Sequence, residues 1–176
     1  MTDEIQSKSK AIVALARELL DDIELSRLSG ESLLLKAIRL ARLSDAEKEL
    51  MWFAYELAGY AHDDPVALEY MGLMERWTDY EKKLGWWMPL AQIETTIAAI
   101  KIQMQTLRVP DVSYSPSNPH SWPTSDFMIL SEPINSVIQK GAELSHLIGQ
   151  LGGIRSRVIA YTHSFVVRVY HEKKFS

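Results

Sequence analysis

The sequence predicts an all-α protein: a single-domain bundle of about five to seven helices with one long loop rich in proline and serine. Apolar residues recur at helical spacing through most of the chain, and residues that start or stop helices separate these stretches. The length of 176 residues is typical of one domain. A domain of this size buries about 70% of the surface that its unfolded chain exposes, so a substantial core is expected.

The N-terminal part of the chain, residues 4–60, is expected to form three helices with a shared core. Apolar residues at helical spacing define each of them. Leu34 and Ile38 lie on the apolar stripe of the second helix, and Phe53 and Leu57 lie on that of the third. We therefore expect these four side chains to be buried together.

Two local signals predict the boundaries of the third helix. Ser44 and Glu47 match a capping box, in which the serine hydroxyl accepts from a free backbone N–H and the glutamate reaches back to the cap residue. Gly59 is suited to end the helix, since glycine tolerates the left-handed conformation common just past a helix C-terminus.

The middle of the chain is expected to contain two helices with an ambiguous segment between them. Asp64 is suited to cap a helix over residues 66–77, with Pro65 at its first position. Residues 78–88 are compatible with a turn, a short strand or an irregular packed loop. A further helix opens at Pro89. Its apolar stripe consists of Ile93, Ile97, Ile100, Met104 and Leu107.

A loop over residues 109–126 and helices over residues 131–172 complete the expected fold. The loop holds four of the seven prolines and five serines, and loops of this length are commonly functional or mobile. Ser131 is suited to cap the first C-terminal helix, and a break is expected at Gly152-Gly153.

Composition excludes several classes of protein. The absence of cysteine excludes a disulfide scaffold and every metal site that uses cysteine. The sequence shows neither a signal peptide nor a run near the roughly 18 apolar residues of a membrane span, so a soluble, cytoplasmic protein is expected. The net charge of −4 provides no large positive field, which makes nucleic acid an unfavoured partner.

His62-Asp63-Asp64 is the local cluster that most resembles a set of metal ligands. It lies next to Pro65 in an expected turn between helices, where aspartates commonly serve as caps, and capping is the favoured interpretation. No metal site and no cofactor are therefore expected.

A second acidic cluster, Asp21, Asp22 and Glu24, could supply two catalytic carboxylates or simply solvate a helix connection. The sequence contains neither a G-x-S-x-G elbow nor a glycine-rich phosphate loop. No catalytic residue is predicted, and we expect a protein that is not an enzyme.

Trp77, Trp86 and Trp87 lie close together in the sequence and are candidates for stacking on a ligand or base. Their surroundings are acidic, so packing in the core or at an interface between protein chains is the favoured role. The surplus of aromatic residues from Tyr70 to Trp87 also motivates the expectation of self-association.

The C-terminal helix carries the most basic surface expected for the chain. Arg157 and Arg168 are 11 residues apart and therefore nearly eclipsed on a helix, with His171, Lys173 and Lys174 nearby. These residues either form a solvated flank, with cations favourably placed near a helix C-terminus, or bind an anionic partner. Such a partner would be nucleic acid or an acidic protein surface.

The sequence resembles the AbiTii domain family, which is named for a bacterial abortive-infection protein of phage resistance. The resemblance is carried by residues 32–43, Ser-Leu-Leu-Leu-Lys-Ala-Ile-Arg-Leu-Ala-Arg-Leu, and residues 52–60, Trp-Phe-Ala-Tyr-Glu-Leu-Ala-Gly-Tyr. The family has a close counterpart of Glu-Leu-x-Gly-Tyr at the second segment. Weaker similarity appears at residues 89–94 and 154–158, whereas the Asp63-Asp64-Pro65 segment departs from the family pattern.

The resemblance implies a helical domain of an antiphage defence protein that acts through contacts with other proteins. Its expected partner is a second copy of the chain or another defence protein. Two alternatives remain open. One is a small toxin-like enzyme, a hydrolase or nuclease whose site is assembled from dispersed residues. The other is a weak nucleic-acid binder that uses the basic C-terminal helix.

Overall fold

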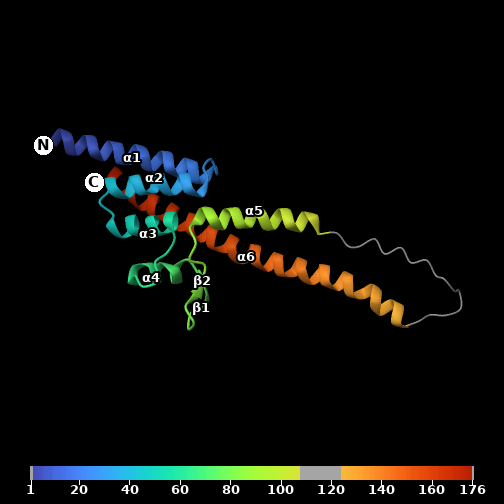
Figure 1. Ribbon diagram of the computed structural model, residues 1–176. Coiled ribbons are helices and arrows are strands. Elements are labelled where there is room, and N and C mark those ends of the chain that lie inside the picture. The colour runs from blue at the N-terminus through green and yellow to red at the C-terminus, as the bar shows by residue number, and fades with distance from the viewer. Residues whose placement is uncertain (1, 108–123, 176) are drawn as a thin grey trace. The chain divides into compact units, whose positions relative to one another are not determined.

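The structure is a computed structural model that describes the backbone of residues 2–107 and 124–175, and the side chains of residues 6–107 and 134–175. Six helices and one two-stranded antiparallel sheet form the described residues, which confirms the predicted all-α class (Figure 1). The elements in chain order are α1 (Thr2–Glu24), α2 (Gly30–Leu43), α3 (Glu47–Ala58), α4 (Pro65–Leu73), β1 (Trp77–Asp79), β2 (Leu84–Gly85), α5 (Leu90–Thr106) and α6 (Thr124–Lys174).

The chain divides into two compact units, Met1–Thr95 with Gly152–Ser176, and Thr96–Leu151. The first unit contains α1 to α4, the hairpin formed by β1 and β2, the start of α5 and the last part of α6. The second contains the remainder of α5 and the beginning of α6, where Ile100, Leu144 and Leu151 are buried.

In the first unit, α2 packs between α1 and α3 (Figure 1). Its core is continuous with the last part of α6, whose Ile154, Val158, Phe165 and Val169 are buried on one stripe. The predicted burial of Leu34, Ile38 and Phe53 is confirmed. Leu57 is only partly buried, because the deeply buried face of α3 is formed by Trp52, Phe53 and Glu56.

The predicted capping box at Ser44 and Glu47 is wrong. Ser44 is the C-cap of α2, and its hydroxyl donates to the carbonyl oxygen of Leu40 at 2.8 Å. Asp45, with a φ of 58°, reverses the chain, and α3 then begins after Ala46 without a side-chain cap. The hydroxyl prefers the free carbonyl of the preceding helix, an alternative that serine side chains have near helix ends. Ser29 instead caps α2, since its oxygen accepts from the N–H of Ser32 at 3.3 Å.

The predicted start of α4 is confirmed. Asp64 is its N-cap and accepts from the N–H of Val66 at 2.8 Å, with Pro65 in the first turn. The helix ends at Leu73, earlier than the predicted residue 77, because Glu75 adopts a φ of 50° and the chain enters the hairpin. The ambiguous segment 78–88 thus contains a short strand, β2, which pairs with β1.

The predicted break at Gly152-Gly153 is also wrong, since α6 continues through both glycines. Burial of Leu151 and Ile154 on either side holds this segment in the core, and packing outweighs the low helix propensity of glycine. The helix already exists at residue 131, having begun at Thr124. The loop expected at 109–126 and the capping side chain of Ser131 lie outside the described residues, except that residues 124–126 are helical.

No helix in the described part of the chain combines the length and apolar character that crossing a membrane requires.

Candidate functional site

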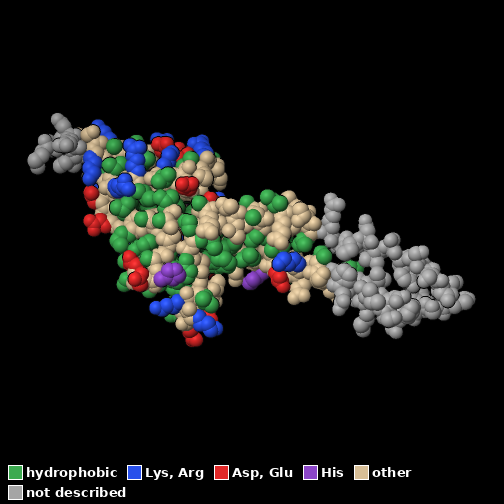
Figure 2. All heavy atoms as spheres, viewed as in Figure 1, with side chains coloured by type: hydrophobic (Ala, Val, Ile, Leu, Met, Phe, Trp, Pro, Cys, Tyr) green, Lys and Arg blue, Asp and Glu red, His purple; other side chains and the backbone are tan. Residues whose placement is uncertain are grey.

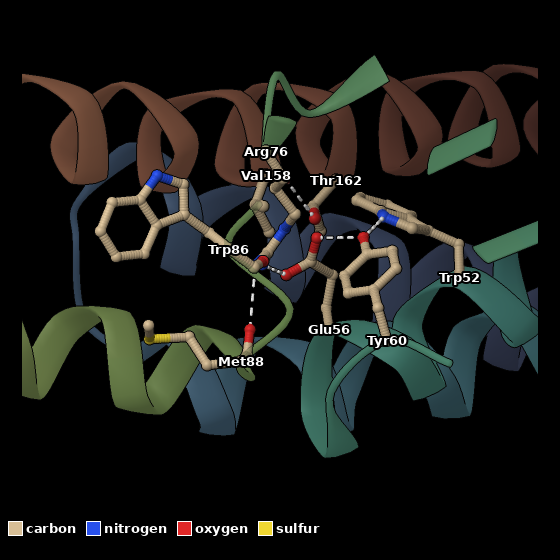
Figure 3. A network of polar contacts seen from close by, with 8 residues as sticks. All are labelled: Trp52, Glu56, Tyr60, Arg76, Trp86, Met88, Val158 and Thr162. Carbon is tan, nitrogen blue, oxygen red and sulfur yellow. Dashed lines mark hydrogen bonds and ion pairs between the residues drawn. The ribbon is translucent and has the colours of Figure 1, made fainter. Parts of the chain in front are cut away.

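The most buried charges of the described chain form an ion pair between α3 and the segment that follows α4. Glu56 and Arg76 are both fully buried, and the Nη2 atom of Arg76 donates to the Oε2 atom of Glu56 (Figure 3). The Nη1 atom of Arg76 donates to the carbonyl oxygens of Trp86 at 2.7 Å and Met88 at 2.9 Å. The guanidinium therefore connects α3 with the chain that leaves β2.

Tyr60 and Trp52 extend this pair into a buried network. The Tyr60 hydroxyl donates to the Oε1 atom of Glu56 at 2.5 Å and accepts from the indole N–H of Trp52 at 3.1 Å (Figure 3). Burial, followed by the negative charge of Glu56, raises the pKa of Tyr60 far above its ordinary value. The hydroxyl is therefore a protonated donor that satisfies the second carboxylate oxygen of Glu56.

Local backbone geometry explains why these residues can meet. Gly59 ends α3 with a φ of 100°, and the N–H of Tyr60 donates to the carbonyl oxygen of Trp87 at 2.9 Å. A Cβ atom on Gly59 would lie 3.2 Å from that same carbonyl oxygen. The Glu-Leu-x-Gly-Tyr motif thus combines the buried carboxylate of Glu56, a turn that favours glycine at Gly59, and the hydroxyl of Tyr60, which donates to that carboxylate.

This network has a structural role in holding the hairpin against α3. Besides the bonds made by its side chain, Arg76 accepts at its own carbonyl oxygen from the N–H of Trp86 at 2.8 Å. A Cβ atom on Gly85 would lie 2.7 Å from that oxygen, which explains the glycine there. The Nε atom of Arg76 and the indole nitrogen of Trp77 are buried without a hydrogen-bond partner among the described residues, a local cost of enclosing the pair.

Neither Glu56 nor Arg76 was singled out as a site residue by sequence analysis. A signal for Glu56 exists, because it lies three residues after Phe53 on the apolar face of α3. A charge at such a position is rarely buried without a partner, so a partner could have been expected. Nothing in the sequence near Arg76 identifies it as that partner.

The three predicted tryptophans lie together around the hairpin and are half-buried. The ring of Trp77 meets that of Trp87 edge to face at 5.2 Å, and the His62 ring lies 3.9 Å from the Trp87 ring. Trp86 contributes its backbone to the Arg76 network. Their possible role in partner binding remains a prediction.

One residue from each acidic cluster singled out in the sequence, Asp64 and Asp22, is held by neighbouring groups. Asp64 accepts from the hydroxyl of Tyr55 as well as from the cap N–H, and these bonds, that of Tyr55 first, lower the pKa of Asp64. Asp22 lies 2.6 Å from the ammonium of Lys36, which also binds Glu18 at 2.7 Å and has a raised pKa because of these two carboxylates. Within the described residues, no group of three potential ligands is placed to hold a metal ion.

The basic residues predicted on α6 have different partners. Arg157 pairs with Glu75 after α4, and Arg168 pairs with Glu49 on α3. His171 is exposed, and its ring stacks with that of Phe175 at 5.8 Å. Lys173 and Lys174 instead lie opposite α1.

An open groove of about 690 Å³ lies between α1 and the end of α6. Its four cations are Lys10 and Arg17 from α1 and Lys173 and Lys174 from α6. Figure 2 shows that Lys and Arg side chains gather over the region of α1 and α2. Of these four cations, Lys173 and Lys174 belong to the predicted basic surface of α6, whereas Lys10 and Arg17 were not singled out, because residues more than 150 positions apart are brought together only by the fold.

Comparison with curated proteins and with solved structures finds no match to this chain. The model of one protein family, AbiTii, matches residues 14–176, which include the whole buried network but not Ser9, Lys10 and Val13 of the groove. Since this match extends over almost the entire sequence, the chain belongs to the AbiTii family.

Proposed function

We propose that the chain is a domain of a bacterial abortive-infection system against phage and that it acts through contacts with other proteins, without catalysis of its own. Membership of the AbiTii family supports the role in defence, since the family is named for abortive-infection phage resistance. A second copy of the chain or another defence protein is the proposed partner.

The contrast between the interior and the surface supports action through protein contacts. Inside, both carboxylate oxygens of Glu56 are bound, one by Arg76 and one by Tyr60, so this carboxylate is engaged in holding the fold. On the surface, the groove combines cations with the apolar side chains of Val13 and Ala14. Charged and apolar groups in one open groove are typical of recognition, whereas nucleophilic catalysis needs a nucleophile and a base within hydrogen-bond reach.

Expression of the chain in bacterial cells under phage challenge tests this proposal. The side chains best suited to proton transfer or metal binding outside the buried network are replaced one at a time: His62→Ala, Asp63→Ala, Asp64→Ala and His163→Ala. We expect each variant that keeps its fold and oligomeric state to keep protection, because no chemical step depends on these groups.

Circular dichroism and light scattering on the purified variants separate loss of function from loss of structure. Asp64→Ala is the variant most prone to unfolding, since Asp64 caps α4. Asp64→Asn keeps a capping side chain while removing the charge, and it serves as the matched variant. Loss of protection in any folded variant with unchanged assembly would favour the enzyme alternative.

A further inference from the structure

The groove between α1 and the end of α6 is long, and a hydrogen bond joins its two walls at one end. Its α1 side runs from Ser9 to Asp21, which at the rise of an α-helix is about 18 Å. At the α6 end, the hydroxyl of Ser9 donates to the carbonyl oxygen of Lys173 at 3.3 Å, which ties the two walls together. A groove of this length matches about three turns of a bound helix.

Some cations elsewhere in the first unit are paired with carboxylates. Lys36, Arg157 and Arg168 are each neutralised by a carboxylate. In the groove, by contrast, Lys10 and Lys173 make no ion pair within the part of the chain that the structure describes.

The other two groove cations also keep their positive charge available to a ligand. Arg17 has no ion pair with a described residue, and the ammonium of Lys174 donates to the hydroxyl of Tyr170 at 2.9 Å, a neutral partner. Of the two groove carboxylates, Glu18 is already bound to Lys36. The groove therefore carries excess positive charge, although the whole chain has a net charge of −4.

Apolar groups between these charges restrict the kind of anion that fits. Val13 is partly exposed and Ala14 is exposed in the middle of the α1 wall, one turn from both Lys10 and Arg17. A phosphate backbone would gain nothing from this apolar strip and would meet the carboxylate of Asp21 at the far end. An amphipathic helix with acidic side chains beside its apolar stripe would match both features.

We propose that this groove binds an acidic amphipathic helix of a partner protein. The carboxylates of that helix pair with Lys10, Lys173 and Lys174, while its apolar side chains cover Val13 and Ala14. This inference rests on the proposed function, action through protein contacts, and adds the site and the chemistry of the partner.

Fluorescence anisotropy with the 176-residue chain tests the groove. The probe is a labelled 14-residue helical peptide with leucine on one face and glutamate beside it. Three comparison ligands are used: the same peptide with glutamine for glutamate, a single-stranded 12-mer oligonucleotide, and vesicles of phosphatidylcholine with phosphatidylglycerol. We expect the acidic peptide to bind at least tenfold more tightly than the glutamine peptide and more tightly than either of the other ligands.

The matched variants change the same total charge at two places. Lys10→Glu with Lys173→Glu replaces two of the four groove cations with carboxylates and is expected to weaken peptide binding at least tenfold. Arg39→Glu with Lys101→Glu, at exposed positions outside the groove, is expected to change it less than twofold. If Lys10→Glu with Lys173→Glu fails to fold, Ala14→Trp, which fills the apolar strip at an exposed position, tests the same site and is expected to weaken binding.

Several outcomes would overturn the inference: equal binding of the glutamine peptide, equal loss with the control pair, or tighter binding of the oligonucleotide or vesicles. Phage challenge separates this failure from failure of the proposed function. If the acidic peptide does not bind but the alanine variants of the chemical residues keep protection, the groove inference fails alone. If a folded His62→Ala or His163→Ala variant loses protection, the proposed function fails whatever the peptide result.

Discussion

Glu56 and Arg76 form a fully buried ion pair in the first unit. Both are removed from water, and isolated charges in such a place are strongly unfavourable. Their mutual bond, together with those from Tyr60 and to the carbonyls of Trp86 and Met88, offsets that penalty. Removal of one partner should therefore do more harm than removal of both.

We predict that Glu56→Gln destabilises the protein by about 3 to 5 kcal/mol, because it leaves the guanidinium buried without a counter-charge. The double variant Glu56→Leu with Arg76→Leu should lose less stability than the sum of the losses in Glu56→Leu alone and Arg76→Leu alone. Urea unfolding followed by circular dichroism measures each difference. Lys8→Ala, which removes an exposed ion pair with Asp45, is the control and should leave the unfolding midpoint close to that of the original chain. A midpoint for Glu56→Gln equal to that of Lys8→Ala would contradict the prediction.

Tyr60 makes stability sensitive to alkaline pH. Its pKa is raised in the folded state, by burial first, so the folded protein retains a proton that the unfolded chain loses near the ordinary tyrosine pKa of about 10. The stabilisation is fully present below about pH 10 and is lost as the pH rises above it, by at most about 1.4 kcal/mol per pH unit. Tyr60→Phe should make this alkaline decline shallower. Urea titrations between about pH 9 and pH 11 test this, and identical slopes for the two proteins would count against it.

The turn between α2 and α3 illustrates how a local motif can be assigned to the wrong helix. Ser44 and Glu47 have capping-box spacing, yet the Ser44 hydroxyl donates to the carbonyl of Leu40, and α3 starts without a side-chain cap. Ser29 performs the capping role for α2.

These assignments lead to opposite expectations for two serines. Ser29→Ala should destabilise by about 1 kcal/mol, because it removes the oxygen that accepts from a free N–H at the start of α2. Ser44→Ala should change stability by less than about 0.5 kcal/mol, since its back-bond to the preceding turn contributes little. Thermal melting of the two variants in parallel measures the difference. A larger loss for Ser44→Ala would restore the capping-box interpretation.

The continuity of α6 through its two glycines yields a test by stabilisation. A Cβ atom on Gly152 would meet nothing within 4 Å outside the helix backbone, so alanine fits there. Alanine also lowers the conformational entropy of the unfolded chain, which favours the folded state. We predict that Gly152→Ala stabilises the protein by about 0.5 to 1 kcal/mol. At Gly30, by contrast, a Cβ atom would lie 2.8 Å from the Cδ2 atom of Leu90, and Gly30→Ala should destabilise. Denaturant unfolding of both variants decides this, and destabilisation by Gly152→Ala would indicate that the helix is interrupted.

For the molecule as a whole, self-association remains a prediction, and the structure refines where to test it. Of the aromatic segment that motivates it, Tyr70 is buried, whereas Tyr80 in the hairpin is 75% exposed and the neighbouring Leu84 is 54% exposed. Large apolar side chains on a surface are enriched at interfaces between protein chains.

We predict the mass of a dimer in light scattering at micromolar to millimolar concentrations. Tyr80→Ser with Leu84→Ser should shift the measured mass toward the monomer. Leu25→Ser with Leu35→Ser, at two exposed leucines outside the hairpin, should not. A monomer mass for the unsubstituted chain over the whole concentration range would rule self-association out.

The sequence alone determined the helical class, the existence of most helices, and the burial of Leu34, Ile38 and Phe53. These properties follow from apolar periodicity and from residues such as Pro65 and Gly59, which act over a few neighbouring positions. Similarity over the Glu-Leu-x-Gly-Tyr segment also predicted the family correctly.

Only the tertiary structure decided the features that depend on distant partners. Packing on either side of Gly152 keeps α6 helical where a break was predicted. The hydroxyl of Ser44 donates to the carbonyl of Leu40 and therefore does not cap α3 as predicted. Glu56 and Arg76 lie 20 residues apart and meet only because α4 and the hairpin bring the chain back to α3. The cationic groove likewise joins α1 to the end of α6. Periodicity reports which face of a helix is apolar, but which helix faces which, and which charges then meet, is set by the packing of the whole unit.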